Sequence, residues 1–186
     1  KYGSSPVDRQ KVKALNGDGK EVEVSLTDPD PVCYIFKTMS EAQFGELSFF
    51  RVYSGSVKMG SELYNTDRRS SEKIGQIYIL NGKTRVSVPS LNAGDIGAVV
   101  KLKDTHTGNT LCNPKHPVSL PKVIYPKPCI HASLKSTAKG EEEKVASGLA
   151  ALHHEDPTFA HHVDSELHQT VLSAQGELHL EVIADR

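Results

Sequence analysis

The segment GELSFFRVYSGSVKMG, which begins at Gly45, constrains the fold more than any other part of the sequence. In an extended chain Leu47 and Phe49 share one face, while Phe50 and Val52 share the opposite face. Both faces therefore carry bulky side chains until a Ser-Gly pair interrupts the run. A strand of this kind suits a small barrel, where one face fills the interior and the other packs on a neighbouring element.

Similar short segments recur between residues 31 and 121. They are rich in β-branched and aromatic residues, lie at intervals of roughly ten residues and are separated by turns that contain glycine. Besides the segment above, they are VCYIFKT, KIGQIYIL, KTRVSV, DIGAVVKL and LCNPKHPVSL. This spacing predicts a small closed β-barrel over residues 31–121 rather than an open sheet.

Two segments flank the predicted barrel. Residues 1–30 are predicted to form a tail and a hairpin arm, because the turn sequence NGDG precedes the alternating segment VEVSL. On the other side, PKVIYPKP has three prolines in eight residues and predicts a stiff linker over residues 122–128.

Residues 129–186 change from a pure strand pattern to a mixed one. The segments CIHASLK, FAHHV and HQTVLSA read as strands, whereas Glu141–His154 and GELHLEVIADR read as amphipathic helices. Thr137 is the expected N-cap of the first helix, and Asp156-Pro157 is its expected end. The order β-α-β-β-α predicts an incomplete ferredoxin-like domain that stops before its last strand. The fold class is thus β followed by α+β.

Composition narrows the classes of function. The formal net charge of −1 gives no overall basic signal for nucleic acid, and no apolar run is long enough to cross a membrane. The three cysteines, Cys33, Cys112 and Cys129, are odd in number and widely spaced. They favour a reducing compartment over a disulfide framework. We expect a cytoplasmic, monomeric chain with no membrane contact.

The nine histidines raise the question of a metal site. In the pairs His153-His154 and His161-His162, neighbouring side chains point in different directions, so only one of each pair can reach a common centre. The sequence has no HExxH motif, and solvated or structural histidines are the simpler interpretation. Cys129 shares a strand face with His131, but a Cys/His nucleophile needs a third, orienting group. We therefore expect no catalytic residue and no bound metal in this chain.

Four segments together resemble the elongation factor G family of translational GTPases. They are FGELSFFRVYSGSVKMGSELYN, LNAGDIGAVVKLKDTHTGNTLC, HEDPTF and QGELHLEVIADR, and the opening SSPVD is similar to the end of the family's GTP-binding domain. The resemblance implies the family's second domain, a β-barrel, followed by part of its ferredoxin-like third domain. Since the sequence has no GxxxxGK[ST] motif, we expect no cofactor in this chain; GTP and Mg²⁺ would be bound elsewhere in the parent protein.

The resemblance also implies partners. The barrel would dock on RNA and proteins of the small ribosomal subunit and brace the parent's own GTP-binding domain. The third domain would pass the nucleotide state to the translocating tip. A ribosomal protection factor of the tetracycline-resistance type and a stand-alone RNA-binding barrel remain alternatives.

The residues expected to face another domain or the ribosome are Glu155, Asp156, Pro157, Glu177, His179, Arg51, Lys122 and Lys127. Structural roles are the competing interpretation for several of them. Asp156-Pro157 could simply end a helix, and Glu177 could be an acidic residue that stabilises a helix N-terminus. Lys122 and Lys127 could contact an RNA backbone or belong to a solvated connector.

Overall fold

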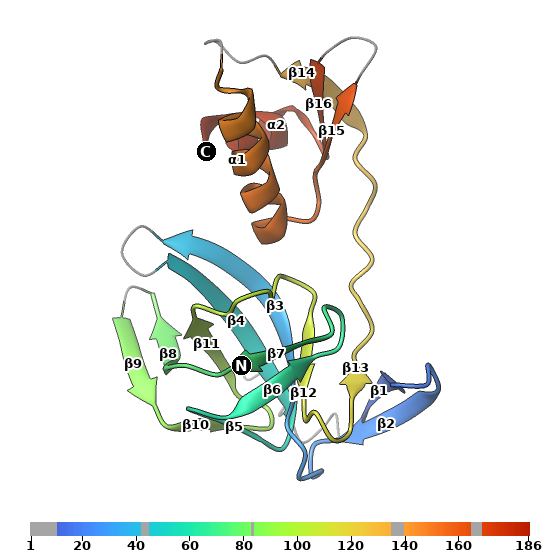
Figure 1. The fold of residues 1–186 in the computed structure, drawn as a ribbon, viewed down its shortest axis with the longest axis vertical. Helices are drawn as coiled ribbons and strands as arrows, with labels where there is room; N and C mark the ends of the chain where they lie inside the picture. Colours follow the sequence, from blue (N-terminus) through green and yellow to red (C-terminus); the bar gives the residue numbers. More distant parts are fainter. Residues whose placement is uncertain (1–10, 42–44, 83, 135–139, 165–168) are drawn as a thin grey trace, which may run out of the picture. The chain divides into compact units, whose positions relative to one another are not determined.

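A computed structural model describes most of the chain (Figure 1). The described residues are 11–41, 45–82, 84–134, 140–164 and 169–186. They fall into two units, Lys1–Val123 and Ile124–Arg186, which are treated separately below. No helix formed by these residues has the length and apolar character that crossing a membrane requires.

The first unit is built on one antiparallel sheet of eight strands, in the order β7-β6-β12-β3-β4-β11-β8-β9. The strands curl around a common interior (Figure 1). Their bounds are β3 (Val32–Glu41), β4 (Gly45–Ser54), β6 (Glu62–Asn65), β7 (Ser70–Lys73), β8 (Ile77–Asn81), β9 (Thr84–Val88), β11 (Ile96–Val100) and β12 (Thr110–Cys112).

A two-stranded ribbon links the two ends of this sheet. The ribbon pairs β5 (Ser56–Lys58) with β10 (Ser90–Asn92). Just after β5, the Met59 amide donates to the Pro89 carbonyl at 2.9 Å, and the Gly60 amide donates to the Ile74 carbonyl at 2.8 Å. The sheet thus closes into a barrel through the ribbon, and the predicted small β-barrel is confirmed.

Strand β4 has both of its faces occupied, as its sequence predicts. Phe50 and Val52 point into the barrel, where each is almost completely buried. On the outer face Leu47 is also buried, and Phe49 packs on Phe36 with ring centroids 6.3 Å apart. The buried residues of the barrel interior are Cys33, Ile35, Phe50, Val52, Val57, Leu63, Ile74, Ile77, Leu91, Val99, Leu102 and Leu111.

Two of the predicted strands are wrong in extent. KIGQIYIL is not one strand, because β7 ends at Lys73 and β8 begins at Ile77. The backbone of Ile74 bonds to Gly60 and Ser61 beyond the ribbon, which turns the chain from one strand to the next. LCNPKHPVSL divides into β12 and the short β13 (Val118–Ser119), separated by a loop that contains two prolines.

The predicted hairpin arm is formed by β1 (Lys11–Asn16) and β2 (Glu21–Ser25). The Asn16 side chain closes its turn, accepting hydrogen bonds from the amides of Asp18 and Lys20 at 3.0 and 2.9 Å. Strand β13 pairs with β1 and extends the arm to a three-stranded sheet. The arm lies within the first unit and shares a small core with the outside of the barrel. Its buried members are Ala14, Val24, Val32, Tyr34, Cys112 and Leu120.

The second unit confirms the predicted β-α-β-β-α order. Its elements are β14 (Ile130–Leu134), α1 (Glu142–Glu155), β15 (Ala160–Asp164), β16 (Gln169–Ala174) and α2 (Glu177–Asp185). The sheet order is β14-β16-β15, so β14 and β15 are its edge strands. The core contains Leu149, Phe159, Leu172, Ala174 and Ile183. The expected N-cap, Thr137, lies outside the described residues, and α1 begins after Glu141, whose side chain makes no capping hydrogen bond.

Candidate functional site

The turn after α1 meets the first turn of α2 at a contact between Asp156 and His179. The Asp156 Oδ2 atom lies 3.1 Å from His179 Nε2, and the Gln175 amide donates to His179 Nδ1 at 3.3 Å. Because Nδ1 accepts a hydrogen bond, this arrangement places a proton on Nε2, which donates to the carboxylate. The contact joins two segments that are 23 residues apart in the sequence.

The Asp156 carboxylate also closes its own turn. Its Oδ1 atom accepts hydrogen bonds from the Thr158 amide at 2.9 Å and from the Thr158 hydroxyl at 2.5 Å. Burial by itself raises the pKa of the Asp156 carboxyl. The bonds from Thr158 and the His179 ring outweigh burial, so the pKa lies below its ordinary value.

We expect the lowered pKa of Asp156 to make the second unit sensitive to acid. A carboxyl with a lowered pKa in the folded state stabilises the fold above its unfolded pKa, near 4, and this contribution is lost as the pH falls through the folded value. The free energy of unfolding should therefore fall as the pH drops below about 5, and more steeply than in Asp156→Asn. Denaturant unfolding at a series of pH values measures this slope. The exposed Asp185→Asn is the control, and an equal slope in both variants would contradict the assignment.

The structure brings most of the candidates of the second unit together. Glu155 lies next to Asp156 and pairs with Arg186 at 2.5 Å, with only 8% of its side chain exposed. Pro157 is inside the turn that the Asp156 carboxylate closes. Glu177 is exposed in the first turn of α2, two residues before His179.

Gln175 is a member of this junction that sequence reasoning missed. Its side-chain amide donates to the carbonyl of Thr158 at 2.8 Å and to the carbonyl of Pro126 at 3.0 Å. It therefore ties together the end of the linker, the turn after α1 and the start of α2. Nothing in the type or spacing of this residue distinguishes it from a surface glutamine.

Three imidazoles surround Phe159 in the core of this unit. The ring centroids of His153, His161 and His179 lie 5.4, 6.3 and 6.3 Å from that of Phe159. Burial, and then the charge of His153, lower the pKa of His161. Within the described ranges, no group of three histidine, cysteine, aspartate or glutamate residues is placed to hold a metal ion.

Cys129 and His131 turn to different partners. The Cys129 thiol donates to the Gln175 carbonyl at 3.1 Å, while His131 Nδ1 lies 2.7 Å from the Ser173 hydroxyl. Neither contact forms the thiol–imidazole pair that a cysteine nucleophile needs.

The three basic candidates have different local surroundings. Arg51, in β4, lies over the Tyr53 ring with 5.3 Å between its guanidinium carbon and the ring centroid. Lys122 forms an ion pair with Asp67 at 2.9 Å, so its charge is already engaged. Lys127 is exposed and belongs to the second unit.

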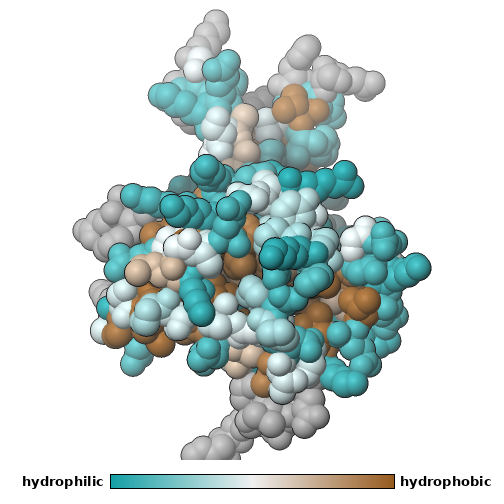
Figure 2. Space-filling view, turned by 60° about the horizontal axis from the view of Figure 1, so that its bottom comes forward, coloured by the Kyte–Doolittle hydropathy of each residue, from teal (hydrophilic) through white to brown (hydrophobic). Residues whose placement is uncertain are grey.

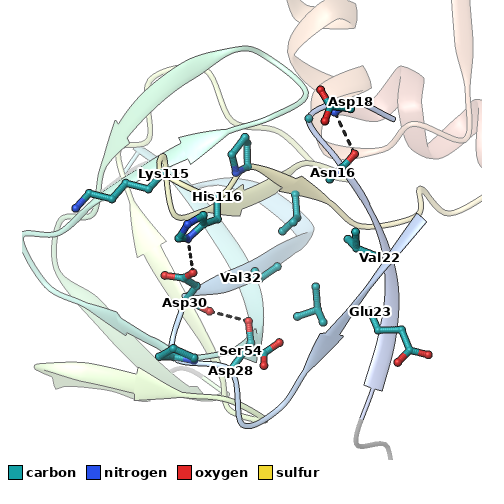
Figure 3. Close-up of a pocket in the computed structure, with 15 residues that line it drawn as sticks. Asn16, Asp18, Val22, Glu23, Asp28, Asp30, Val32, Ser54, Lys115 and His116 are labelled. Carbon is teal, nitrogen blue, oxygen red and sulfur yellow. Dashed lines mark hydrogen bonds and ion pairs between the residues drawn. The ribbon is translucent and has the colours of Figure 1, made fainter. Parts of the chain in front are cut away.

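A pocket of about 600 Å³ lies between the arm and the barrel, and the sequence does not predict it (Figure 3). Its walls come from β2, the turn that precedes β3, and the loop that leads into β13. Carboxylates lie around valine and proline side chains in this pocket. Figure 2 shows hydrophobic side chains interspersed among hydrophilic ones on the face that it draws.

Sequence comparison assigns both units to translation factors. The family described as Elongation factor Tu domain 2 matches residues 45–112, within the barrel. The family described as Elongation Factor G, domain III matches residues 125–186, which is the second unit with its last linker residues. The two matches do not overlap and lie one after the other on the chain. The chain belongs to the elongation factor G family.

A solved structure has a similar fold over most of this chain. A crystal structure of a protein from Thermus thermophilus is similar to this chain, with a TM-score of 0.75 and 26% sequence identity. The similarity covers 87% of this chain and 25% of the other protein. The chain therefore spans about a quarter of the length of that solved protein.

The two matched ranges assign most of these sites to one domain or the other. The Asp156–His179 contact lies in domain III, as do the three imidazoles around Phe159. Arg51 lies in the barrel domain, and Lys122 falls between the two matched ranges. The arm that forms one wall of the pocket precedes the matched part of the barrel.

Proposed function

We propose that this chain serves a longer translational GTPase as its ribosome-docking barrel and as the domain that couples GTP hydrolysis to translocation. The observation that carries the proposal is the succession of two matched domains, a barrel of the elongation factor Tu type and then domain III of elongation factor G. Two different matched domains in this order indicate a translation factor much more specifically than either domain would alone.

Each of the two units has its own role in the proposed function. The barrel docks on RNA and proteins of the small ribosomal subunit and contacts the GTP-binding domain of the longer protein. The exposed Lys127 is free of the ion pair that holds Lys122, so it is the better placed of the two to approach an RNA phosphate. A factor that works on ribosomes in this way acts in the cytoplasm.

The residues of this chain do not fit GTP or Mg²⁺. The sequence has no GxxxxGK[ST] loop, and the described residues hold no group of acidic or histidine ligands for a metal. The longer protein would bind the nucleotide and its metal elsewhere. The contribution of this chain is to dock on the ribosome and to couple GTP hydrolysis to translocation.

Transmission requires a structural element that differs between two states of the protein. The junction around Asp156 and His179 is suited to this role, because a side-chain contact joins the end of α1 to the start of α2. A relative movement of the two helices would break this contact without unfolding either helix.

We expect Asp156→Ala or His179→Ala, in the longer protein, to slow translocation by about fivefold or more, the lower end of typical coupling free energies. Ribosome-stimulated GTP hydrolysis should stay close to that of the unsubstituted protein, since neither residue touches the nucleotide. Rapid kinetics of phosphate release and of messenger RNA movement measure the two steps separately.

Lys144→Ala is the matched control, because it removes only an exposed 3.7 Å ion pair with Glu141 in the same unit. Equal translocation rates in all three variants would refute the coupling role. Release of tetracycline from ribosomes in place of translocation would instead assign the longer protein to the ribosomal protection type.

A further inference from the structure

The pocket between the arm and the barrel has an apolar floor. Val24 and Val32 are buried there, and Val22 and Val118 are partly buried beside them. Figure 3 shows Val22 and Val32 between two polar ends of the pocket, with Asn16 and Asp18 at one end and Asp28 and Asp30 at the other. Its volume of about 600 Å³ is that of a site for a small ligand or for a few side chains.

The charged groups around this floor are predominantly carboxylates. Glu23 is paired with Lys11 at 2.8 Å, and Asp30 lies 2.7 Å from His116 Nδ1. Asp18 and Asp28 have no ion pair with any residue that the structure describes.

Asp28 presents a carboxylate that is already oriented. Its Oδ2 atom accepts a hydrogen bond from the Ser25 amide at 2.7 Å, which fixes the side chain and leaves Oδ1 for another donor. The nearest lysine of the lining, Lys115, extends away from the pocket (Figure 3). Lys11 and Lys115 act on Asp28 and Asp30 through their charge but form no ion pair with them, so carboxylates remain in excess around the pocket and favour a cationic partner.

We propose that this pocket is a docking site for a lysine- or arginine-bearing segment of a partner protein. The methylene groups of a long basic side chain would pack on the valines, and its charged end would reach the carboxylate of Asp28. The same carboxylates would repel phosphate, so we expect the pocket to prefer the basic segment over RNA. The docking site is separate from the Asp156–His179 junction and goes beyond the proposed role in translocation.

Three tripeptide probes test the proposal on the 186-residue chain. They are acetyl-Leu-Lys-Val-amide, the same peptide with norleucine in place of lysine, and the same peptide with glutamate. Titrations followed through backbone amide signals should show saturable shifts at Val24, Val32 and Val118 for the lysine peptide. The norleucine peptide should bind about two- to fivefold more weakly, the range of a solvent-exposed ion pair, and the glutamate peptide more weakly again.

Asp28→Asn should abolish the preference for lysine over norleucine, because the amide keeps the bond from Ser25 and loses only the charge. Asp95→Asn is the matched control, since Asp95 Oδ2 accepts the Asn92 amide at 2.9 Å in the same i to i−3 geometry, away from the pocket. The preference should persist in Asp95→Asn. If Asp28→Asn does not fold, loss of the preference at high salt in the unsubstituted chain supports the same conclusion.

Three results would overturn the proposal. The first is equal affinity for all three peptides, and the second is a set of shifted amides that lies outside the pocket. The third is a short single-stranded RNA that shifts the same valine amides at the same salt concentration, which would make this surface a nucleic-acid site.

Discussion

Replacing Gly55 by alanine is expected to lower the free energy of unfolding of the first unit by about 2–4 kcal/mol, the combined effect of backbone strain and overpacking. Gly55 has a φ of +62°, a region that side chains other than glycine rarely adopt. A Cβ atom there would lie 2.6 Å from both the Pro29 carbonyl oxygen and the Asp30 carbonyl carbon. Since these atoms belong to the backbone, they can yield only if the turn before β3 moves away from the barrel.

Gly60→Ala separates the effect of strain from that of the close approach. Gly60 has a φ of +81°, but no described atom beyond its two chain neighbours lies within 4 Å of the position that a Cβ would take. Its substitution should cost about 1 kcal/mol, from the backbone conformation alone. Urea unfolding followed by amide signals of the first unit compares the two variants, and equal losses would show that the turn does not approach β4 as closely as described.

The second large effect is expected at Glu72, a carboxylate that is 1% exposed inside the first unit. It accepts hydrogen bonds from the amides of Lys103 and Asp104 at 3.0 and 2.8 Å, and from the Thr105 hydroxyl at 2.8 Å. Glu72→Ala leaves these three donors without their acceptor. The expected loss is about 3–5 kcal/mol, because hydrogen bonds to a charged group contribute more than neutral ones and the buried Thr105 hydroxyl loses its acceptor.

Glu62→Ala is the matched control for Glu72→Ala. Glu62 is exposed on the neighbouring strand β6, so its removal should change the free energy of unfolding by less than about 0.5 kcal/mol. Hydrogen exchange of the amides of Lys103 and Asp104 gives a second readout. Those amides should lose protection in Glu72→Ala before the rest of the barrel does, and unchanged protection would contradict the account of this loop.

Local sequence patterns predicted strands and turns correctly where a single local property, such as strand periodicity or turn chemistry, determines the structure of the segment. The bulky two-faced run at β4 indicated a barrel, and the NGDG turn indicated the arm, because turn chemistry and strand periodicity are local properties. Division of KIGQIYIL at Gly75 was not predictable in this way. The division depends on backbone hydrogen bonds between Ile74 and two residues, Gly60 and Ser61, that are distant from it in the sequence.

The candidate sites could be predicted from the sequence even less well than the strand boundaries, because they depend on contacts between distant segments. The family resemblance drew attention to Asp156 and His179, but the hydrogen bond between them depends on how α1 and α2 are packed. Gln175 and the arm pocket gave no sequence signal, because each is made by segments that meet only after folding. Arg51, Lys122 and Lys127 lie in separate environments, and their type alone did not reveal that Lys122 is already paired with Asp67.

The central claim is that this chain belongs to a factor whose GTP turnover depends on the ribosome. The most direct measurement is steady-state GTP hydrolysis by the longer protein that contains this chain, with and without ribosomes. The account predicts that ribosomes stimulate hydrolysis strongly. Hydrolysis that is unchanged by ribosomes, in a protein that still binds GTP, would contradict the proposed role and mean that the barrel and domain III serve another docking task.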